Sequence, residues 1–77
     1  MNEIVLLCAF RYALGRRSFV VREVADAIEA AARSSAGLSK ATRTTMVKEI
    51  NAARLANGIG MNMDARIWLH LRDILAE

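Results

Sequence analysis

The sequence has no proline, one cysteine and one histidine among its 77 residues. A lone cysteine cannot close an internal disulfide, and one cysteine with one histidine leaves too few ligands for a metal site made only of protein side chains. The absence of proline, together with abundant alanine and leucine, favours helices. We therefore expect a helical chain that has no metal, no cofactor and no disulfide to support it.

Arrangements of residues that carry out catalysis are also missing. A hydrolytic triad needs a base beside a nucleophile, and that arrangement fails with one histidine and with Cys8 expected inside a helical core. The eight acids fall mostly on faces expected to be solvated, so no two carboxylates converge in an apolar pocket. Gly58-Ile59-Gly60 lacks the preceding strand and the glycine spacing of a phosphate-binding loop. The sequence thus predicts a protein that is not an enzyme and takes no small-molecule substrate.

The most apolar stretch of the chain lies near its start. Ten of the eleven residues in positions 4–14 are apolar or aromatic, and Arg11 is the exception. Glu3 is an acid where a secretion signal carries a base, and the run is too short to span a bilayer. A helix that is apolar around its circumference is enclosed by others. We expect a buried helix, with Cys8 as a small buried hydrophobe in a reducing cytosol. Arg11 either emerges at the surface or meets a buried acid.

Periodicity and capping signals divide the chain into four helices. We expect them at residues 2–14, 21–33, 40–57 and 63–75. Ser39 is a natural N-cap for the third helix and Asn62 for the fourth, while Gly58 is suited to ending the third. The sequence shows no repeat and no linker, and its length suits one domain. The prediction is an all-α fold: a compact four-helix single domain over residues 1–77, with the N-terminal helix at its centre.

The predicted second and third helices differ in how their charges are arranged. On its outer face the second pairs acids with bases four residues apart, so its charges are balanced and we assign that face no function. In the third, Arg43 and Arg54 fall in the same sector as the apolar Met46, Val47 and Ile50. Two explanations stay open: these arginines snorkel, with the stem on the core and the head in water, or a partner supplies acids or phosphates.

The basic excess is mild. A net charge of +3 is not the dense patch of a dedicated nucleic-acid-binding protein. Residues 21–57 nevertheless suggest a helix-turn-helix in which the polar run at 39–45, SKATRTT, opens a recognition helix. The pattern departs from that motif because the first helix is long and because Glu29 stands where the motif usually has a turn glycine. A small DNA-binding regulator is therefore the alternative function.

The segment AFRYALGRRSFVV, residues 9–21, resembles a recurrent type of phage and prophage protein. In those proteins FRYALGRR, followed by a hydroxyl residue, an aromatic and two aliphatic residues, opens a short helical chain. Gly60-Met61, Asp64 and Trp68 are similar to their C-terminal part, whereas the middle of the chain matches poorly. The resemblance covers about half of the sequence. Most such proteins have no assigned activity, but small single-domain phage proteins include anti-CRISPR proteins, and the chain looks like inhibitors of type I surveillance complexes.

This resemblance implies a protein of the host bacterial cytosol that binds a Cas protein of a type I complex, type I-C among the subtypes. Many such inhibitors are acidic mimics of DNA, whereas a basic one would engage an acidic Cas surface or compete near the guide and target backbone. Binding hot spots favour arginine. The expected contact residues are Arg16 and Arg17 in the first connector and Arg43, Lys48 and Arg54 on the third helix. Two other hypotheses stay open: these residues only keep a small protein soluble, or the protein has a structural role in the virion or in host takeover.

Overall fold

The computed structural model describes residues 2–14, 20–34, 37–57 and 63–77. These residues form four α-helices and no strand: α1 (Glu3–Leu14), α2 (Val20–Arg33), α3 (Lys40–Asn57) and α4 (Met63–Leu75). Each predicted helix boundary lies within one residue of the observed one. The prediction of an all-α fold is confirmed.

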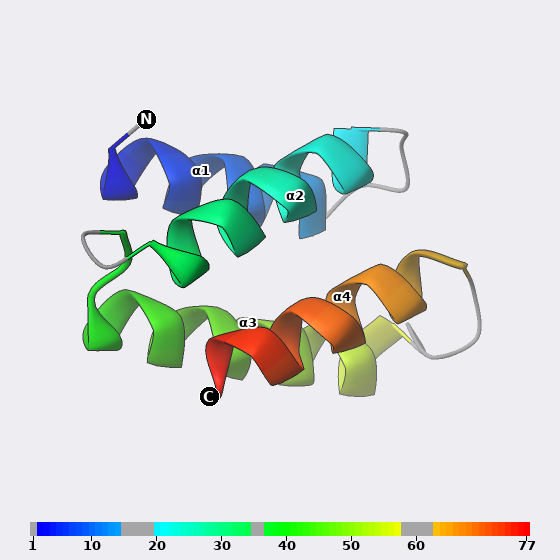
Figure 1. Ribbon diagram of the computed structural model, residues 1–77. Helices are drawn as coiled ribbons and strands as arrows, with labels where there is room; N and C mark the ends of the chain where they lie inside the picture. The colour runs from blue at the N-terminus through cyan, green and yellow to red at the C-terminus, as the bar shows by residue number, and fades with distance from the viewer. Residues whose placement is uncertain (1, 15–19, 35–36, 58–62) are drawn as a thin grey trace.

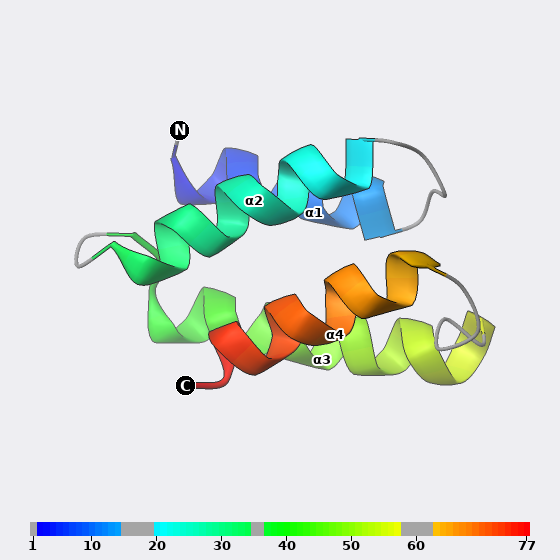
Figure 2. The same ribbon diagram turned by 45° about the vertical axis from the view of Figure 1, so that its right-hand side comes forward.

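The helices are arranged as two hairpins. α1 and α2 run in opposite directions as one pair, α3 and α4 form the other pair, and two views show the first pair lying over the second (Figures 1 and 2). Between the pairs, α1 packs on α3 and α2 packs on α4. The start of α3 and the end of α4 lie at the same end of the bundle (Figure 1).

One apolar stripe from every helix meets in the core. In α1 the buried residues are Leu6, Phe10 and Ala13, spaced so that they share a face. Phe10 meets Trp68 of α4 edge to face, with ring centroids 5.6 Å apart and planes at 88°. Such a pair contributes ~0.5–1.5 kcal/mol beyond the burial of its area. The other buried side chains are Val21, Ala25 and Ile28 of α2, Met46 and Ile50 of α3, and Leu71, Ile74 and Leu75 of α4.

The prediction that the first helix is enclosed at the centre of the fold is wrong. Ile4 is 75% exposed, Tyr12 56% and Val5 47%, and Cys8, which was expected to be buried, is exposed as well. The physical reason is the small number of elements. α1 packs on α2 and α3, and the described residues hold no further element to cover its opposite side. A helix that is apolar all round therefore buries one stripe and exposes the other.

Arg11 emerges at the surface, where it meets an acid that is only partly buried. Its Nε donates to both carboxylate oxygens of Glu49 on α3, at 3.0 and 3.2 Å. The two side chains are 54% and 32% exposed, and ion pairs at such exposure contribute ~0–1 kcal/mol. The pair orients α1 against α3 and adds little to stability.

The start of α3 is capped by residues from two parts of the chain. Ser39 has its predicted N-cap role, because its Oγ accepts from the backbone N–H of Thr42 at 3.2 Å. Glu3 of α1 accepts from the backbone N–H of Ser39. In a capping box that acceptor is a Glu or Gln three residues into the same helix, but here Thr42 holds that position and α1 supplies the carboxylate. The predicted roles of Gly58 and Asn62 lie outside the described residues.

The chain passes close to the last turn of α2 at Gly37. The backbone N–H of Gly37 donates to the carbonyl oxygen of Ser34 at 3.2 Å, and that of Ser34 donates to Ala31 at 3.2 Å. A Cβ atom on Gly37 would lie 1.6 Å from the carbonyl oxygen of Ala31. A side chain at this position therefore forces the backbone to move.

Gly37→Ala is expected to lower the free energy of unfolding by ~1–3 kcal/mol, because the added methyl group must displace backbone rather than a flexible side chain. Urea denaturation followed by circular dichroism measures the change. Ala52→Ser also adds one heavy atom, at an exposed position of α3, and should change stability by less than ~0.5 kcal/mol. Equally small effects of the two substitutions would contradict the close approach at Gly37.

The cap from Glu3 should make stability depend on pH. Hydrogen bonds from the backbone and side chain of Ser39, and from the side chain of Thr42, hold the pKa of Glu3 below its ordinary value of 4.5. A depressed folded-state pKa contributes stability that is fully present above the unfolded pKa and is lost as pH falls through the folded value. Wild-type protein should therefore have a higher melting temperature than Glu3→Gln near neutral pH, and the difference should close as pH falls below 4.5. A difference that does not change with pH would show that the carboxylate does not act as the cap.

Candidate functional site

The structure brings together two of the five predicted contact residues. Arg43 and Lys48 line one open groove between the first half of α3 and the end of α4. Arg54 lies in the last turn of α3, exposed and away from this groove. Arg16 and Arg17 lie outside the described residues. The predicted set is therefore not one patch, and the groove is the place where its described members meet.

This α3–α4 groove has a volume of about 420 Å³. It lies at the end of the bundle where α3 begins and α4 ends (Figure 1). Its lining consists of five residues of α3 and three at the end of α4: Lys40, Arg43, Thr44, Val47, Lys48, Leu75, Ala76 and Glu77. Residues from two helices thus form one hollow that neither helix forms alone.

One wall of the α3–α4 groove is a row of exposed polar side chains on α3. Lys40, Thr44 and Lys48 recur every four residues, so they lie along one side of the helix. Eight residues of helix place the two lysine Cα atoms ~12 Å apart along the axis. Neither ammonium group has an ion-pair partner among the described residues. This lysine row therefore presents two positive charges at a defined spacing, neither in an ion pair with a described residue.

The groove beside the lysine row is apolar. Val47 is half-buried and Leu75 is buried, so their side chains form a floor between α3 and α4. Glu77, contributed from the end of α4, is the acid among the lining residues. Binding sites commonly combine an apolar surface with a few placed polar groups. A cationic wall over an apolar floor suits a ligand that carries negative charge and an apolar group together.

Arg43 lines the groove but also connects α3 to α2. Its Nη2 donates to the carbonyl oxygen of Ala32, in the last turn of α2, at 3.3 Å. Its Nε is buried and has no acceptor among the described residues. Because a buried donor without an acceptor costs ~1–3 kcal/mol, packing of the arginine stem and the bond to α2 must hold the side chain in place. Arg43 therefore differs from both explanations that the sequence left open, because its guanidinium group is bonded to α2 and partly buried instead of lying in water or waiting free for a partner.

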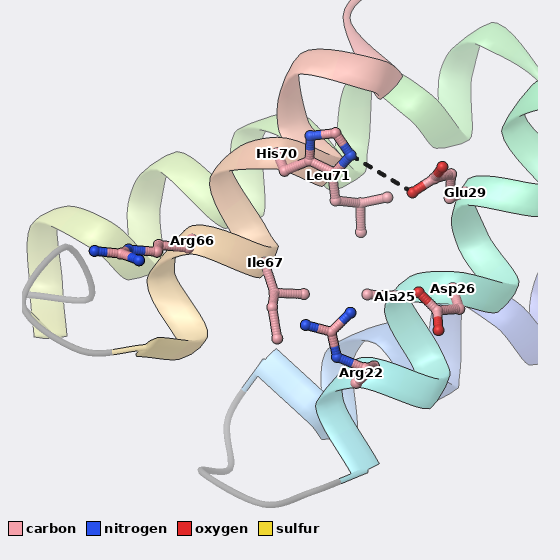
Figure 3. Close-up of a pocket in the computed structure, with 8 residues that line it drawn as sticks. All are labelled: Arg22, Ala25, Asp26, Glu29, Arg66, Ile67, His70 and Leu71. Carbon is pink, nitrogen blue, oxygen red and sulfur yellow. Dashed lines mark ion pairs between the residues drawn. The ribbon is translucent and has the colours of Figure 1, made fainter.

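A second groove, of about 280 Å³, runs between α2 and α4 (Figure 3). Glu29 on its rim is shared between Arg33, at 3.2 Å, and His70, at 3.7 Å. Figure 3 shows Arg22 reaching over the groove. The charged lining residues are two of each sign: Arg22, Asp26, Glu29 and Arg66. Since these charges largely compensate one another, we interpret this groove as part of the contact between α2 and α4.

A third hollow, of about 600 Å³, lies between α1 and α2 and is lined mainly by small side chains. Its charged lining residue, Glu3, is already bonded to Ser39. Within the described residues no three histidine, cysteine, aspartate or glutamate side chains are placed to hold a metal ion. None of the helices formed by the described residues is long and apolar enough to cross a membrane.

Comparison with known proteins adds no relative: the chain matches no family model, no curated protein and no solved structure. A function must therefore be argued from the grooves themselves and from the resemblance in residues 9–21. Among the three hollows, the α3–α4 groove is the one whose lining carries an excess of positive charge.

Several residues of this groove are not among the predicted contact residues. Lys40 was left out of the predicted contact set, although its spacing of eight residues from Lys48 on one helix is a signal that the two lie on one side. Leu75 and Glu77 were given no role in binding. No sequence signal places the end of α4 beside the start of α3, because that proximity comes from how the two hairpins stack.

Arg43→Ala should lower the free energy of unfolding by ~1–2 kcal/mol, through lost packing of the stem and the lost hydrogen bond to α2. Lys48→Ala, at an exposed position of the same helix, should change it by less than ~0.5 kcal/mol. Arg43→Met keeps the stem and removes the unpaired Nε, so it should recover part of the loss. Chemical denaturation of the three variants measures these values. Unchanged stability of Arg43→Ala would mean that this side chain is not structural.

Proposed function

We propose that this protein is a phage-encoded anti-CRISPR protein that binds a type I surveillance complex stoichiometrically and blocks target-DNA binding or interference. The observation that carries the proposal is the lysine row, with two unpaired ammonium groups over the apolar floor of the α3–α4 groove. A protein of this kind acts by occupying a surface. In this proposal it is not an enzyme, it needs no cofactor or membrane, and it works in the host bacterial cytosol.

The segment AFRYALGRRSFVV supports a phage origin through its resemblance to phage and prophage proteins. The basic character of the chain supports one mode of inhibition over another. With a net charge of +3 the protein does not imitate the phosphate backbone of DNA, so an acidic surface of a Cas protein is the partner that its charge complements. Complementary charge of this kind steers association and fixes the register of the bound partner.

The helix-turn-helix alternative has less support from the geometry. In that motif two helices cross at ~90–120° and the second lies in the major groove. Here α2 and α3 run in nearly opposite directions along the bundle (Figures 1 and 2). Ser39 and Thr42, two of the polar residues that would open a recognition helix, are bonded to each other in the cap. These contacts and this helix orientation therefore support direct DNA binding less than they support a protein partner.

The test is inhibition of a purified type I-C surveillance complex, measured by retardation of its target DNA in a gel. Wild-type protein should abolish target-DNA binding at an equimolar ratio. Lys48→Glu should weaken inhibition at least ~tenfold, equivalent to ~1.4 kcal/mol of binding free energy, because it replaces attraction by repulsion. Arg66→Glu makes the same change of charge on α4 at an exposed residue that does not line the α3–α4 groove, and it should inhibit like the wild type.

A surveillance complex that stays fully active and retains none of the added protein would refute the proposal. Retardation of duplex DNA by the protein alone, weakening steeply as salt rises, would identify the DNA-binding regulator instead, because each neutralised phosphate releases counterions.

A further inference from the structure

The chemistry of the α3–α4 groove narrows the class of partner that it accepts. We infer that the groove binds an acidic amphipathic helix of a partner protein, with two carboxylates on the lysine row and one apolar side chain on the floor formed by Val47 and Leu75. This inference rests on the proposed binding role and adds the chemistry of the bound segment.

The spacing of the lysine row matches one face of a helix. A partner helix lying along α3 carries side chains seven or eight residues apart on one face, ~10–12 Å along its axis, close to the separation of Lys40 and Lys48. A residue midway between the two acids falls on that same face, opposite the apolar floor. The lysine ammonium groups sit on flexible stems with three donors each, so small differences in helix alignment are tolerated.

The lining of the groove favours a protein segment over a nucleic acid. Grooves for single strands combine basic side chains with aromatic rings on which the bases stack, and the residues that line this groove include no aromatic. The guanidinium of Arg43, which would suit a phosphate, is already bonded to Ala32. An acidic helix with a single apolar side chain can pair its carboxylates with the two lysines and bury the apolar side chain on the floor of the groove.

The probe is a synthetic helical peptide of about 16 residues, with two glutamates eight positions apart and a leucine midway between them. Isothermal titration calorimetry with the full chain should detect binding that weakens as salt rises. A peptide with glutamine in place of both glutamates should bind at least ~tenfold more weakly. The double variant Lys40→Glu/Lys48→Glu should lose affinity for the glutamate peptide to at least the same extent.

Two controls separate charge complementarity from damage to the fold. Arg54→Glu/Arg66→Glu makes the same change of net charge away from the α3–α4 groove and should keep the affinity within ~twofold, because salt screens distant charges. A third peptide, with lysine in place of both glutamates, should bind Lys40→Glu/Lys48→Glu and should not bind wild-type protein. Circular dichroism of each variant verifies that the helices are intact.

Equal binding of the glutamate and glutamine peptides, or no binding of either, would overturn the inference. A single-stranded oligothymidylate that binds more tightly than the glutamate peptide, and is lost in Lys40→Glu/Lys48→Glu, would assign the groove to nucleic acid and overturn it as well. If the peptide fails while Lys48-dependent inhibition of the surveillance complex is observed, the partner chemistry is wrong and the proposed function stands. If the peptide binds as expected but the complex is unaffected, the inference about the groove stands and the proposed function is wrong.

Discussion

The edge-to-face contact between Phe10 and Trp68 joins α1 to α4, the first helix of one hairpin to the second helix of the other. A chain of 77 residues buries only ~60% of the surface that its unfolded form exposes, and isolated short helices are marginal in water. Neither hairpin has a disulfide to support it, since the chain has one cysteine. The four helices therefore depend on a shared core, and the two aromatic rings are its largest members. The α3–α4 groove depends on the same core, because packing in it holds the end of α4 against the start of α3.

The helices were accessible to prediction because their signals are local. Ser39 caps α3 through its own hydroxyl group, and the alternation of apolar and charged residues marks the inner face of α2 within its own 14 residues. The surroundings of α1 could not be predicted from local signals. A helix that is apolar all round is enclosed only when enough other helices are present to cover it. The number of covering helices is a property of the whole chain and not of the helix itself. Ile4 and Cys8 were misplaced for this reason.

The candidate site was predicted only in part, again because the sequence indicates local structure but not how the helices pack against one another. Arg43 and Lys48 are five residues apart, ~140° around the axis of α3, so periodicity does not place them on one side, yet the structure shows both lining one groove. Periodicity does not say what faces a side chain. Arg43 lies against the carbonyl of Ala32, which belongs to the end of α2, so a residue expected to contact a partner instead supports the fold. Leu75 and Glu77 enter the site from 27 or more residues beyond Lys48 in the sequence, a proximity that only tertiary packing creates.

The exposed position of Cys8 on α1 gives the molecule one chemically unique point on its surface. A maleimide dye or a nitroxide attached there modifies a single site, and it does so on a helix that contributes nothing to the lining of the α3–α4 groove. The same accessibility means that two molecules can be joined covalently through their thiols in air. Preparations therefore need a reductant if the apparent molecular mass is to reflect non-covalent association alone.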